Sequence, residues 1–369
     1  MLILISIILY HSYRQQGNRS GEIMLDDLNI LNRHNASKDL ELATLEVEQL
    51  NFETIIKNSD HDNRKINNIV VAGMGGSALS AAFVKTWLKS ELLIPFEIVR
   101  TYDLSASIDK NTLVIASSYS GNTEETVSCL VEAQEKGAQI AIIASGGKLL
   151  EIANSDQIAH IILPIGHQPR MAMITMICST IAILENFDVL AKGKLKEIAQ
   201  SYCWLKEEIN KWAGDVPTVD NYAKKLALHA VGKTAVFFSG TFTYPAAFKF
   251  KVCFNETSKN TAFLCEFPEF NHNEFLGWTS HPIEKPFAIF DVISGFEHPQ
   301  ILKRFEISNK LLSGKRPRSH TIKLAGETKI EQLLWGSILA DFVSIYLAVL
   351  NGVDPMSVEL IERLKKELV

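Results

Sequence analysis

Apolar runs alternate with helix-like segments in the first half of the chain. Continuous apolar stretches at 67–72, 112–116 and 139–144 are typical of strands that are buried on both faces of a parallel sheet. The stretch 78–84 has helical composition, and Thr123-Glu124-Glu125-Thr126 supplies the cap and acidic first turn of another helix. Because strand, helix and strand follow one another, the pattern predicts right-handed parallel crossovers in an α/β domain.

The second half repeats this order in a degraded form. A strand at 234–238, a turn at Ser239-Gly240-Thr241 and a helix at 246–251 repeat it, and a buried strand at 287–292 and an apolar helix at 331–350 follow. We therefore predict an α/β fold of two tandem α/β/α sandwich domains with parallel sheets. The expected limits are an apolar extension outside the fold at 1–23, an N-terminal domain at 24–190, a helical bridge at 191–225 and a C-terminal domain at 226–369.

Two short turns carry the clearest chemical signal. Gly73-Met74-Gly75-Gly76-Ser77 and Ser117-Ser118-Tyr119-Ser120-Gly121-Asn122-Thr123 each follow an apolar run and open a helical pattern. Free backbone N–H groups and the positive end of a helix favour an anion at such turns, so we expect one shared phosphate. The spacing fits neither a dinucleotide fingerprint nor a P-loop. The alternative interpretation is that these serines only cap helices and close turns.

Composition narrows the function class. A length of 369 residues predicts two cores, and a net charge of −5 gives no electrostatic footprint for nucleic acid. The five cysteines include no C-x-x-C pair, which argues against a disulfide framework and a zinc site and favours a reducing, cytoplasmic location. The apolar residues 1–10 are too few to cross a bilayer, which needs about 20. We expect no membrane partner.

A carboxylate and an imidazole are candidates for proton transfer. Asn255-Glu256 and Asn271-His272-Asn273-Glu274 lie in the second half, and we expect both on loops at one edge of a sheet. Arg170 is a candidate for stabilising a developing oxyanion. The alternatives without a catalytic role are a surface acid for Glu256, a loop histidine for His272 and a carboxylate partner for Arg170.

These motifs resemble a known family. Gly75-Gly76-Ser77 and the run Ser118 to Thr126 resemble the sugar isomerase (SIS) fold, which binds phosphosugars at such loops. Over about residues 24–369 the chain resembles the bifunctional phosphoglucose/phosphomannose isomerases of that superfamily. The motifs that carry this narrower resemblance are Gln168-Pro169-Arg170, Asn255-Glu256-Thr257-Ser258-Lys259, Asn271-His272-Asn273-Glu274 and Leu364-Lys365.

The resemblance implies a metal-free aldose–ketose isomerase without a cofactor. It would interconvert glucose 6-phosphate, and mannose 6-phosphate as well, with fructose 6-phosphate through a cis-enediol. The residues that it implies for phosphate binding are Gly76, Ser77, Ser118, Ser120 and Thr123. Glu256 would move the proton, Arg170 would stabilise the enediolate, and His272, from the neighbouring subunit of a homodimer, and Lys365 would assist ring opening. Lys365 also closes a terminal helix, where the helix dipole favours a cation without any catalytic role.

Two other function classes stay open at this point. SIS modules also serve as ligand-binding parts of regulators, but a sensor would need an effector domain such as a helix-turn-helix. An aminosugar-phosphate isomerase would share the phosphate turns and would need a group that handles an amine. Activity on hexose 6-phosphates discriminates both alternatives from the isomerase.

Overall fold

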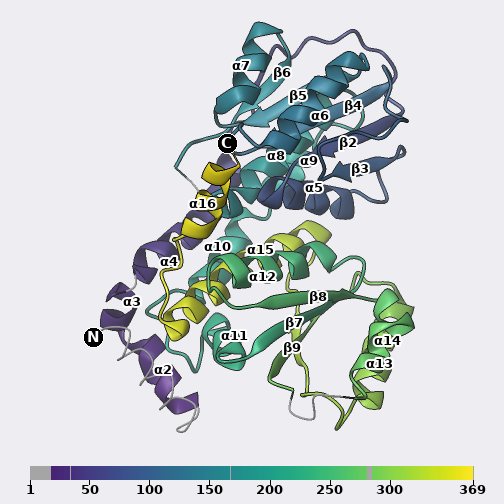
Figure 1. The fold of residues 1–369 in the computed structure, drawn as a ribbon. Helices are drawn as coiled ribbons and strands as arrows, with labels where there is room; N and C mark the ends of the chain where they lie inside the picture. Colours follow the sequence, from purple (N-terminus) through teal and green to yellow (C-terminus); the bar gives the residue numbers. More distant parts are fainter. Residues whose placement is uncertain (1–17, 34, 167, 281–284, 369) are drawn as a thin grey trace. The chain divides into compact units, whose positions relative to one another are not determined.

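A computed structural model describes residues 18–33, 35–166, 168–280 and 285–368 of the chain. They form two compact units. We call Glu46–Cys203 the middle unit. The C-terminal unit combines the described residues up to Leu45 with those from Trp204 onward. Figure 1 shows a sheet with covering helices in each unit.

The middle unit contains a six-stranded sheet in the order β1-β6-β5-β4-β2-β3. All neighbouring pairs are parallel except β1 with β6. The strands are β1 (Ile56–Lys57), β2 (Asn68–Ala72), β3 (Phe96–Val99), β4 (Thr112–Ser118), β5 (Gln139–Ala144) and β6 (Ala159–Ile162). The helices are η1 (Leu45–Asn51), α5 (Gly75–Trp87), α6 (Glu124–Glu135), α7 (Gly147–Ser155), η2 (Pro169–Met171), α8 (Met173–Asn186) and α9 (Lys194–Ala199). The predicted parallel α/β arrangement is confirmed here.

Alternate strand residues of the middle unit face two helical layers. Val70, Val114 and Ile142 pack in one core cluster with Leu130 of α6 and Leu149 of α7. Successive side chains of a strand point to opposite faces, so the residues between them face the other layer, where α5 and α8 pack together. Burial on both faces explains why these strands are apolar throughout.

The C-terminal unit contains a smaller, fully parallel sheet in the order β10-β9-β7-β8. Its strands are β7 (Thr234–Ser239), β8 (Ala262–Glu266), β9 (Phe287–Ile293) and β10 (His320–Lys323). Its helices are α2 (Asn18–Asp26), α3 (Leu28–Arg33), α4 (Ala36–Thr44), α10 (Tyr202–Asn210), α11 (Tyr222–Ala230), α12 (Tyr244–Glu256), η3 (Glu269–His272), α13 (Glu274–Gly277), α14 (Pro299–Leu311), α15 (Lys329–Asn351) and α16 (Glu359–Glu367). In the middle unit, β3 lies at one edge of the sheet beside β2, and β4 lies on the other side of β2. In the C-terminal unit, β8 lies at one edge beside β7, and β9 lies on the other side of β7.

The apolar segment predicted at 331–350 is the core helix α15. A capping box between Thr328 and Glu331 begins it, and Gly352 in the left-handed conformation ends it. By length and composition α15 could cross a bilayer, but 94% of its apolar 18-residue segment is buried inside the structure. It packs against α4, α11 and α12, so core packing accounts for its apolar surface on every side.

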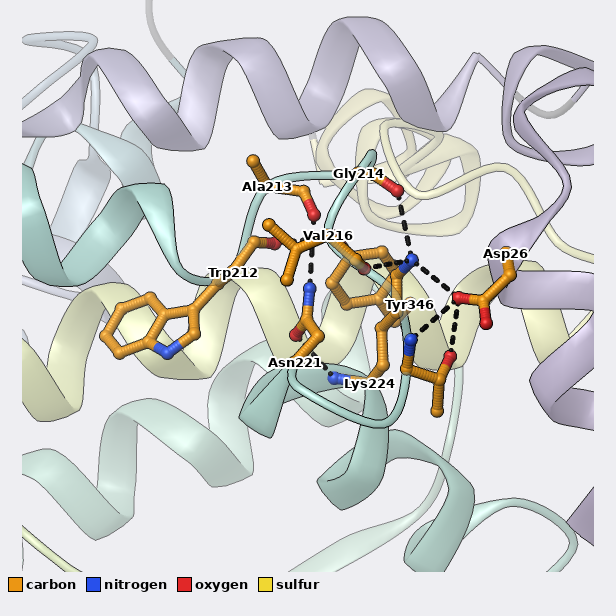
Figure 2. Close-up of polar contacts among 9 residues, drawn as sticks. Asp26, Trp212, Ala213, Gly214, Val216, Asn221, Lys224 and Tyr346 are labelled. Atoms are coloured by element: carbon orange, nitrogen blue, oxygen red, sulfur yellow. Dashed lines mark hydrogen bonds and ion pairs between the residues drawn. The ribbon is translucent and has the colours of Figure 1, made fainter.

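A buried lysine ties the N-terminal helices to the C-terminal unit. The Lys224 ammonium is fully buried and donates to the Asp26 carboxylate at 3.0 Å, to the Gly214 carbonyl at 3.0 Å and to the Val216 carbonyl at 2.8 Å. Figure 2 shows these acceptors around the ammonium, with the Tyr346 ring beside it. A buried ammonium needs such partners, which explains why α2 belongs with this unit.

The unit limits differ from those expected from the sequence. The described residues before Leu45 belong with the second half of the chain, and residues 18–23, expected outside the fold, lie in α2. Residues 1–17 are outside the described residues. The expected bridge at 191–225 is divided, because α9 packs on α8 of the middle unit, whereas the residues from Trp204 onward belong to the C-terminal unit.

Candidate functional site

The two predicted phosphate turns lie side by side at the carboxyl edge of the middle unit's sheet. β2 and β4 are adjacent and parallel, with Ala72 opposite Ala116, so the turns that follow them meet. β3 returns to one side of β2 and β4 to the other, which is the switch point where open α/β sheets bind ligands. α5 begins at Gly75, whose φ of 51° lies in the left-handed region that favours glycine.

Three hydroxyl groups gather in the second turn. The Ser118 and Thr123 hydroxyl oxygens are 2.8 Å apart, and the Ser118 and Ser120 hydroxyl oxygens are 3.5 Å apart. The Gly121 N–H donates to Ser118 Oγ at 3.2 Å. Ser118 is buried, whereas Ser120 is exposed, so the group extends from the end of the strand to the surface. Short hydroxyl donors at the start of α6 suit the oxygens of a phosphate.

A third loop, after β5, fastens this turn. A Cβ on Gly121, whose φ is 71°, would lie 1.8 Å from the Gly146 carbonyl oxygen. The Lys148 N–H donates to Asn122 Oδ1 at 2.9 Å, and the Ser145 N–H to the Tyr119 carbonyl at 2.9 Å. Sequence reasoning missed this loop, although the Gly146-Gly147 pair directly after a buried strand is the same kind of signal as the first turn.

The first turn packs against the segment that carries Arg170. A Cβ on Gly76 would lie 2.8 Å from the Pro169 carbonyl oxygen and 3.6 Å from the Arg170 Cα. Glycine is therefore required for this close approach, and Arg170 lies at the same edge as the phosphate turns. Arg170 is 5% exposed. Ser77 differs from the other hydroxyls, because its Oγ lies 4.0 Å from Met176 Sδ, a weak acceptor.

Gln49 holds the Arg170 segment in place. Its amide NH₂ donates to the Met171 carbonyl at 2.5 Å, and its Oε1 accepts from the Thr175 N–H at 3.1 Å and the Thr175 hydroxyl at 2.8 Å. Gln49 is 6% exposed, so the amide is almost sealed from solvent. It is far from Arg170 in sequence, and no local pattern marks it as part of the site.

Glu256 ends α12 in the C-terminal unit. Asn255 donates from its amide to the Ala262 carbonyl, and the Asn260 amide donates to the Lys233 carbonyl, which places this end beside the amino ends of β7 and β8. Ser258 and Lys259 anchor the segment: Asn351 of α15 donates to the Ser258 carbonyl at 3.0 Å, and the Lys259 ammonium donates to the Asp354 carbonyl.

His272 is exposed at the end of η3, which follows the carboxyl end of β8. Its neighbour Asn271 is clamped by α14: the amide donates to Ser308 Oγ at 2.9 Å, and Arg304 donates to Asn271 Oδ1 at 3.0 Å. Sequence reasoning named neither Arg304 nor Ser308.

The expectation that Glu256 and His272 lie at one edge of a sheet is wrong. Phe254 of α12 packs against Phe237, with ring centroids 5.0 Å apart, whereas Phe270 of η3 packs against Phe238 at 4.7 Å. Phe237 and Phe238 are consecutive in β7 and point to opposite faces. The sheet therefore separates the two segments within one chain.

Lys365 lies in α16, and its side chain is outside what the structure describes. No group of three or more potential metal-binding side chains occurs among the described residues.

A buried polar cluster underlies the His272 face of the sheet. Asn309 and Ser319 donate to Asp291 Oδ2 at 2.6 and 2.7 Å, and Arg316 donates to Asn309 Oδ1 at 2.9 Å. Burial raises the pKa of Asp291 and lowers that of Arg316. The Arg316 guanidinium lies 4.5 Å from the Phe238 ring centroid, so the cluster supports the core beneath η3.

Two family models match the two halves of the chain. The model "SIS domain" matches residues 64–192, which include both phosphate turns and Arg170. The model "Bacterial phospho-glucose isomerase C-terminal SIS domain" matches residues 219–368, which include Glu256 and His272.

Solved structures support the fold. A hypothetical protein of Thermus thermophilus has a TM-score of 0.63 and 14% identity over 97% of this chain and 96% of its own. The tagatose-6-phosphate ketose/aldose isomerase of Escherichia coli has a TM-score of 0.60 and 16% identity over 93% of this chain and 95% of its own.

Two curated relatives are similar over most of their length. The bifunctional phosphoglucose/phosphomannose isomerase of Caldicellulosiruptor bescii is 34% identical over 82% of this chain and 90% of the relative. The protein of that name from Aquifex aeolicus is 32% identical over 87% of this chain and 95% of the relative. The chain therefore belongs to the bifunctional phosphoglucose/phosphomannose isomerase family.

Proposed function

We propose that this protein interconverts glucose 6-phosphate, and mannose 6-phosphate as well, with fructose 6-phosphate. The observation that carries the proposal is the meeting of the two turns with Arg170 at one sheet edge, in a chain that belongs to this family. The edge offers hydroxyl donors, the N-termini of α5 and α6 and a cation, which together suit a phosphorylated sugar.

The phosphate is expected to lie between the two turns. Gly76 allows the backbone to approach, and the hydroxyls of Ser118, Ser120 and Thr123 exchange their contacts with one another for phosphate oxygens. Ser77 would exchange its weak sulfur acceptor for an anionic oxygen, which is the stronger partner.

Glu256 is proposed as the base. It would take the proton from C2 of the open-chain aldose and return it to C1, while a proton moves from the C2 hydroxyl to the C1 oxygen. Arg170 would stabilise the enediolate between these steps, because a cation beside developing negative charge lowers the barrier. His272 and Lys365 would assist opening of the sugar ring. This route needs neither a metal nor another cofactor.

The proposed assembly is a homodimer with shared sites, and the placement of Glu256 and His272 supports it. The sheet separates the two segments within one chain, so one site that contains both needs a second copy of the chain. His272 would then reach the site from the neighbouring subunit.

The cytoplasm is the proposed location, with no nucleic-acid or membrane partner. All five cysteines are free thiols, which fits a reducing compartment.

The direct test is a coupled dehydrogenase assay of fructose 6-phosphate conversion without added metal. Glu256→Gln should lower kcat by about 10²- to 10⁴-fold, because the base is lost, with binding of inorganic phosphate retained. Glu306→Gln, an exposed acid on α14, is the matched control and should keep full activity. Full activity of Glu256→Gln would overturn the base assignment.

Substrate choice is tested in the same assay. Mannose 6-phosphate should react, whereas turnover of glucosamine 6-phosphate alone would favour the aminosugar alternative. Binding of hexose 6-phosphates without any turnover would favour the regulatory module.

Subunit sharing is tested by mixing two inactive variants, Glu256→Gln and His272→Ala. Random reassortment gives hybrid dimers with one intact site in two, so activity should recover to about a quarter of the wild-type value. Mixtures that reassort but stay inactive would contradict the shared site.

A further inference from the structure

The C-terminal unit has a turn in the position that the phosphate turns occupy in the middle unit. β7 and β9 are adjacent and parallel, with Ser239 opposite Val292, just as Ala72 of β2 is opposite Ala116 of β4. β8 lies on the other side of β7, so the turns after β7 and β9 also meet at a switch point. Counting along the strands makes Gly240 equivalent to Gly73, and Ser294 equivalent to Ser118.

The chain's own carboxylate occupies this position. Glu297 Oε1 accepts from the Thr243 N–H at 2.8 Å, and the Thr243 hydroxyl lies 3.1 Å from the same oxygen. The backbone of Phe242 and His298 also lowers the pKa of this carboxyl group, against the larger opposing effect of burial. The Thr243 N–H and hydroxyl, from the turn after β7, thus meet a carboxylate from the loop after β9 that is only 5% exposed.

The Glu297 carboxyl group fills the space that a side chain at Gly240 would need. A Cβ on Gly240 would lie 2.3 Å from Glu297 Oε1 and 2.4 Å from its Cδ, and the three nearest atoms all belong to that carboxyl group. Gly240 does not have a positive φ, so glycine is required here because there is no room for a Cβ and not because of the backbone conformation. The Thr243 hydroxyl fixes the turn further, because it accepts from the Gly240 N–H at 2.9 Å and lies 2.9 Å from the Val292 carbonyl.

We propose that this turn is a second anion-binding site, which Glu297 fills and thereby closes to phosphomonoesters. A carboxylate and a phosphate bind the same kinds of donor, so removal of the carboxylate should leave the Thr243 N–H, the Thr243 hydroxyl and the N-terminus of α12 available to inorganic phosphate. Burial opposes the ionised form of Glu297 and raises its pKa, whereas the converging donors favour the anion. The proposal goes beyond the isomerase reaction, since it concerns a site in the other unit.

The test counts bound phosphate by isothermal titration with inorganic phosphate. Glu297→Ser removes the anion and opens the space, and Glu297→Gln keeps the shape and fills it. We expect Glu297→Ser to bind one phosphate more per chain than either the wild type or Glu297→Gln. Equal stoichiometry in all three proteins would overturn the proposal. The comparison does not depend on the isomerase proposal, because failure of the middle-unit site lowers all three counts alike.

A variant that does not fold is also informative. If Glu297→Ser is unfolded, it is refolded in phosphate and in chloride at equal ionic strength. Folding that is recovered only in phosphate supports the site, because a ligand that binds the native state stabilises it by mass action. Failure in both salts shows that Glu297 is needed for packing alone and overturns the proposal.

Discussion

The two units present different chemical groups in equivalent turns, which follow β2 and β4 in the middle unit and β7 and β9 in the C-terminal unit. The middle unit presents the hydroxyls of Ser118, Ser120 and Thr123, which bond to one another. The C-terminal unit presents a carboxylate, Glu297, to which the Thr243 N–H and hydroxyl already bond. A duplicated fold can therefore keep the geometry of an anion site in both copies and leave only one copy available to a ligand. The difference lies in a few loop residues, because β5-β4-β2-β3 in the middle unit and β10-β9-β7-β8 in the C-terminal unit have the same order.

The largest expected effect comes from closing the open turn. Gly121→Ala places a Cβ 1.8 Å from the Gly146 carbonyl oxygen, so the loops must separate. We expect a fall in kcat/KM of at least about 10²-fold, because misplacement of binding groups by about 1 Å has effects of this size.

Gly137→Ala is the matched control for this variant. Gly137 has a φ of 65°, close to that of Gly121, but nothing lies within 4 Å of its Cβ position. It carries the same backbone strain without the clash, and activity should stay near the wild-type value. Equal losses in both variants would show that strain, and not the contact between the loops, is responsible.

The second effect concerns the filled turn. Gly240→Ala should lower the free energy of unfolding by about 1–3 kcal/mol, because its Cβ overlaps the Glu297 carboxyl group. The same substitution in a Glu297→Ser background should have almost no effect, since its three nearest neighbours are then gone. Denaturant unfolding of the four proteins measures this coupling, and additive effects would contradict the contact.

A smaller effect is expected where Gln49 positions Arg170. Gln49→Met keeps the volume but leaves the Met171 carbonyl and the Thr175 N–H without this partner. We expect kcat to fall about 10-fold, with KM for fructose 6-phosphate nearly unchanged, if Arg170 acts mainly in the transition state. A loss of stability without any change in kcat would mean that Gln49 is structural only.

The smallest effect is a change in the pH dependence of stability, which comes from a histidine of the C-terminal unit. Burial first, and then Lys233 and His320, lower the pKa of His229 in the C-terminal unit from 6.5 to about 4. The unfolded chain therefore takes up a proton at a higher pH than the folded chain, so this contribution to stability is present above about pH 6.5 and is lost as the pH falls toward 4. His229→Gln should reduce the stability difference between pH 7 and pH 4.5 by about 1–2 kcal/mol, measured by urea unfolding. An unchanged pH profile would contradict the shift.

The fold was predictable because its signals are local. Strands buried on both faces, such as 112–116, are mostly apolar, and the start of α6 has a threonine at the N-cap position and two glutamates in its first turn. The packing of α2 with the second half was not predictable. It depends on the pairing of Asp26 with Lys224, which are far apart in sequence and carry no periodic signal.

The candidate site was predictable only where its residues form contiguous motifs. The phosphate turns are contiguous motifs, and the topology brings them together. The faces on which Glu256 and His272 lie depend on how α12 and η3 pack against Phe237 and Phe238, which no motif encodes. Gln49 acts across a long sequence separation, so the sequence of its surroundings does not reveal it.

The discontinuous C-terminal unit has a consequence for synthesis of the chain. The ribosome releases the middle unit as one uninterrupted stretch, which can begin to fold while translation continues. The helices α2 to α4 leave the ribosome before the middle unit, but their partners α11 and α15 are made only after it. The helices α2 to α4 must therefore wait for their partners until the whole middle unit has been made, and during that interval their apolar surface is exposed to chaperones and proteases.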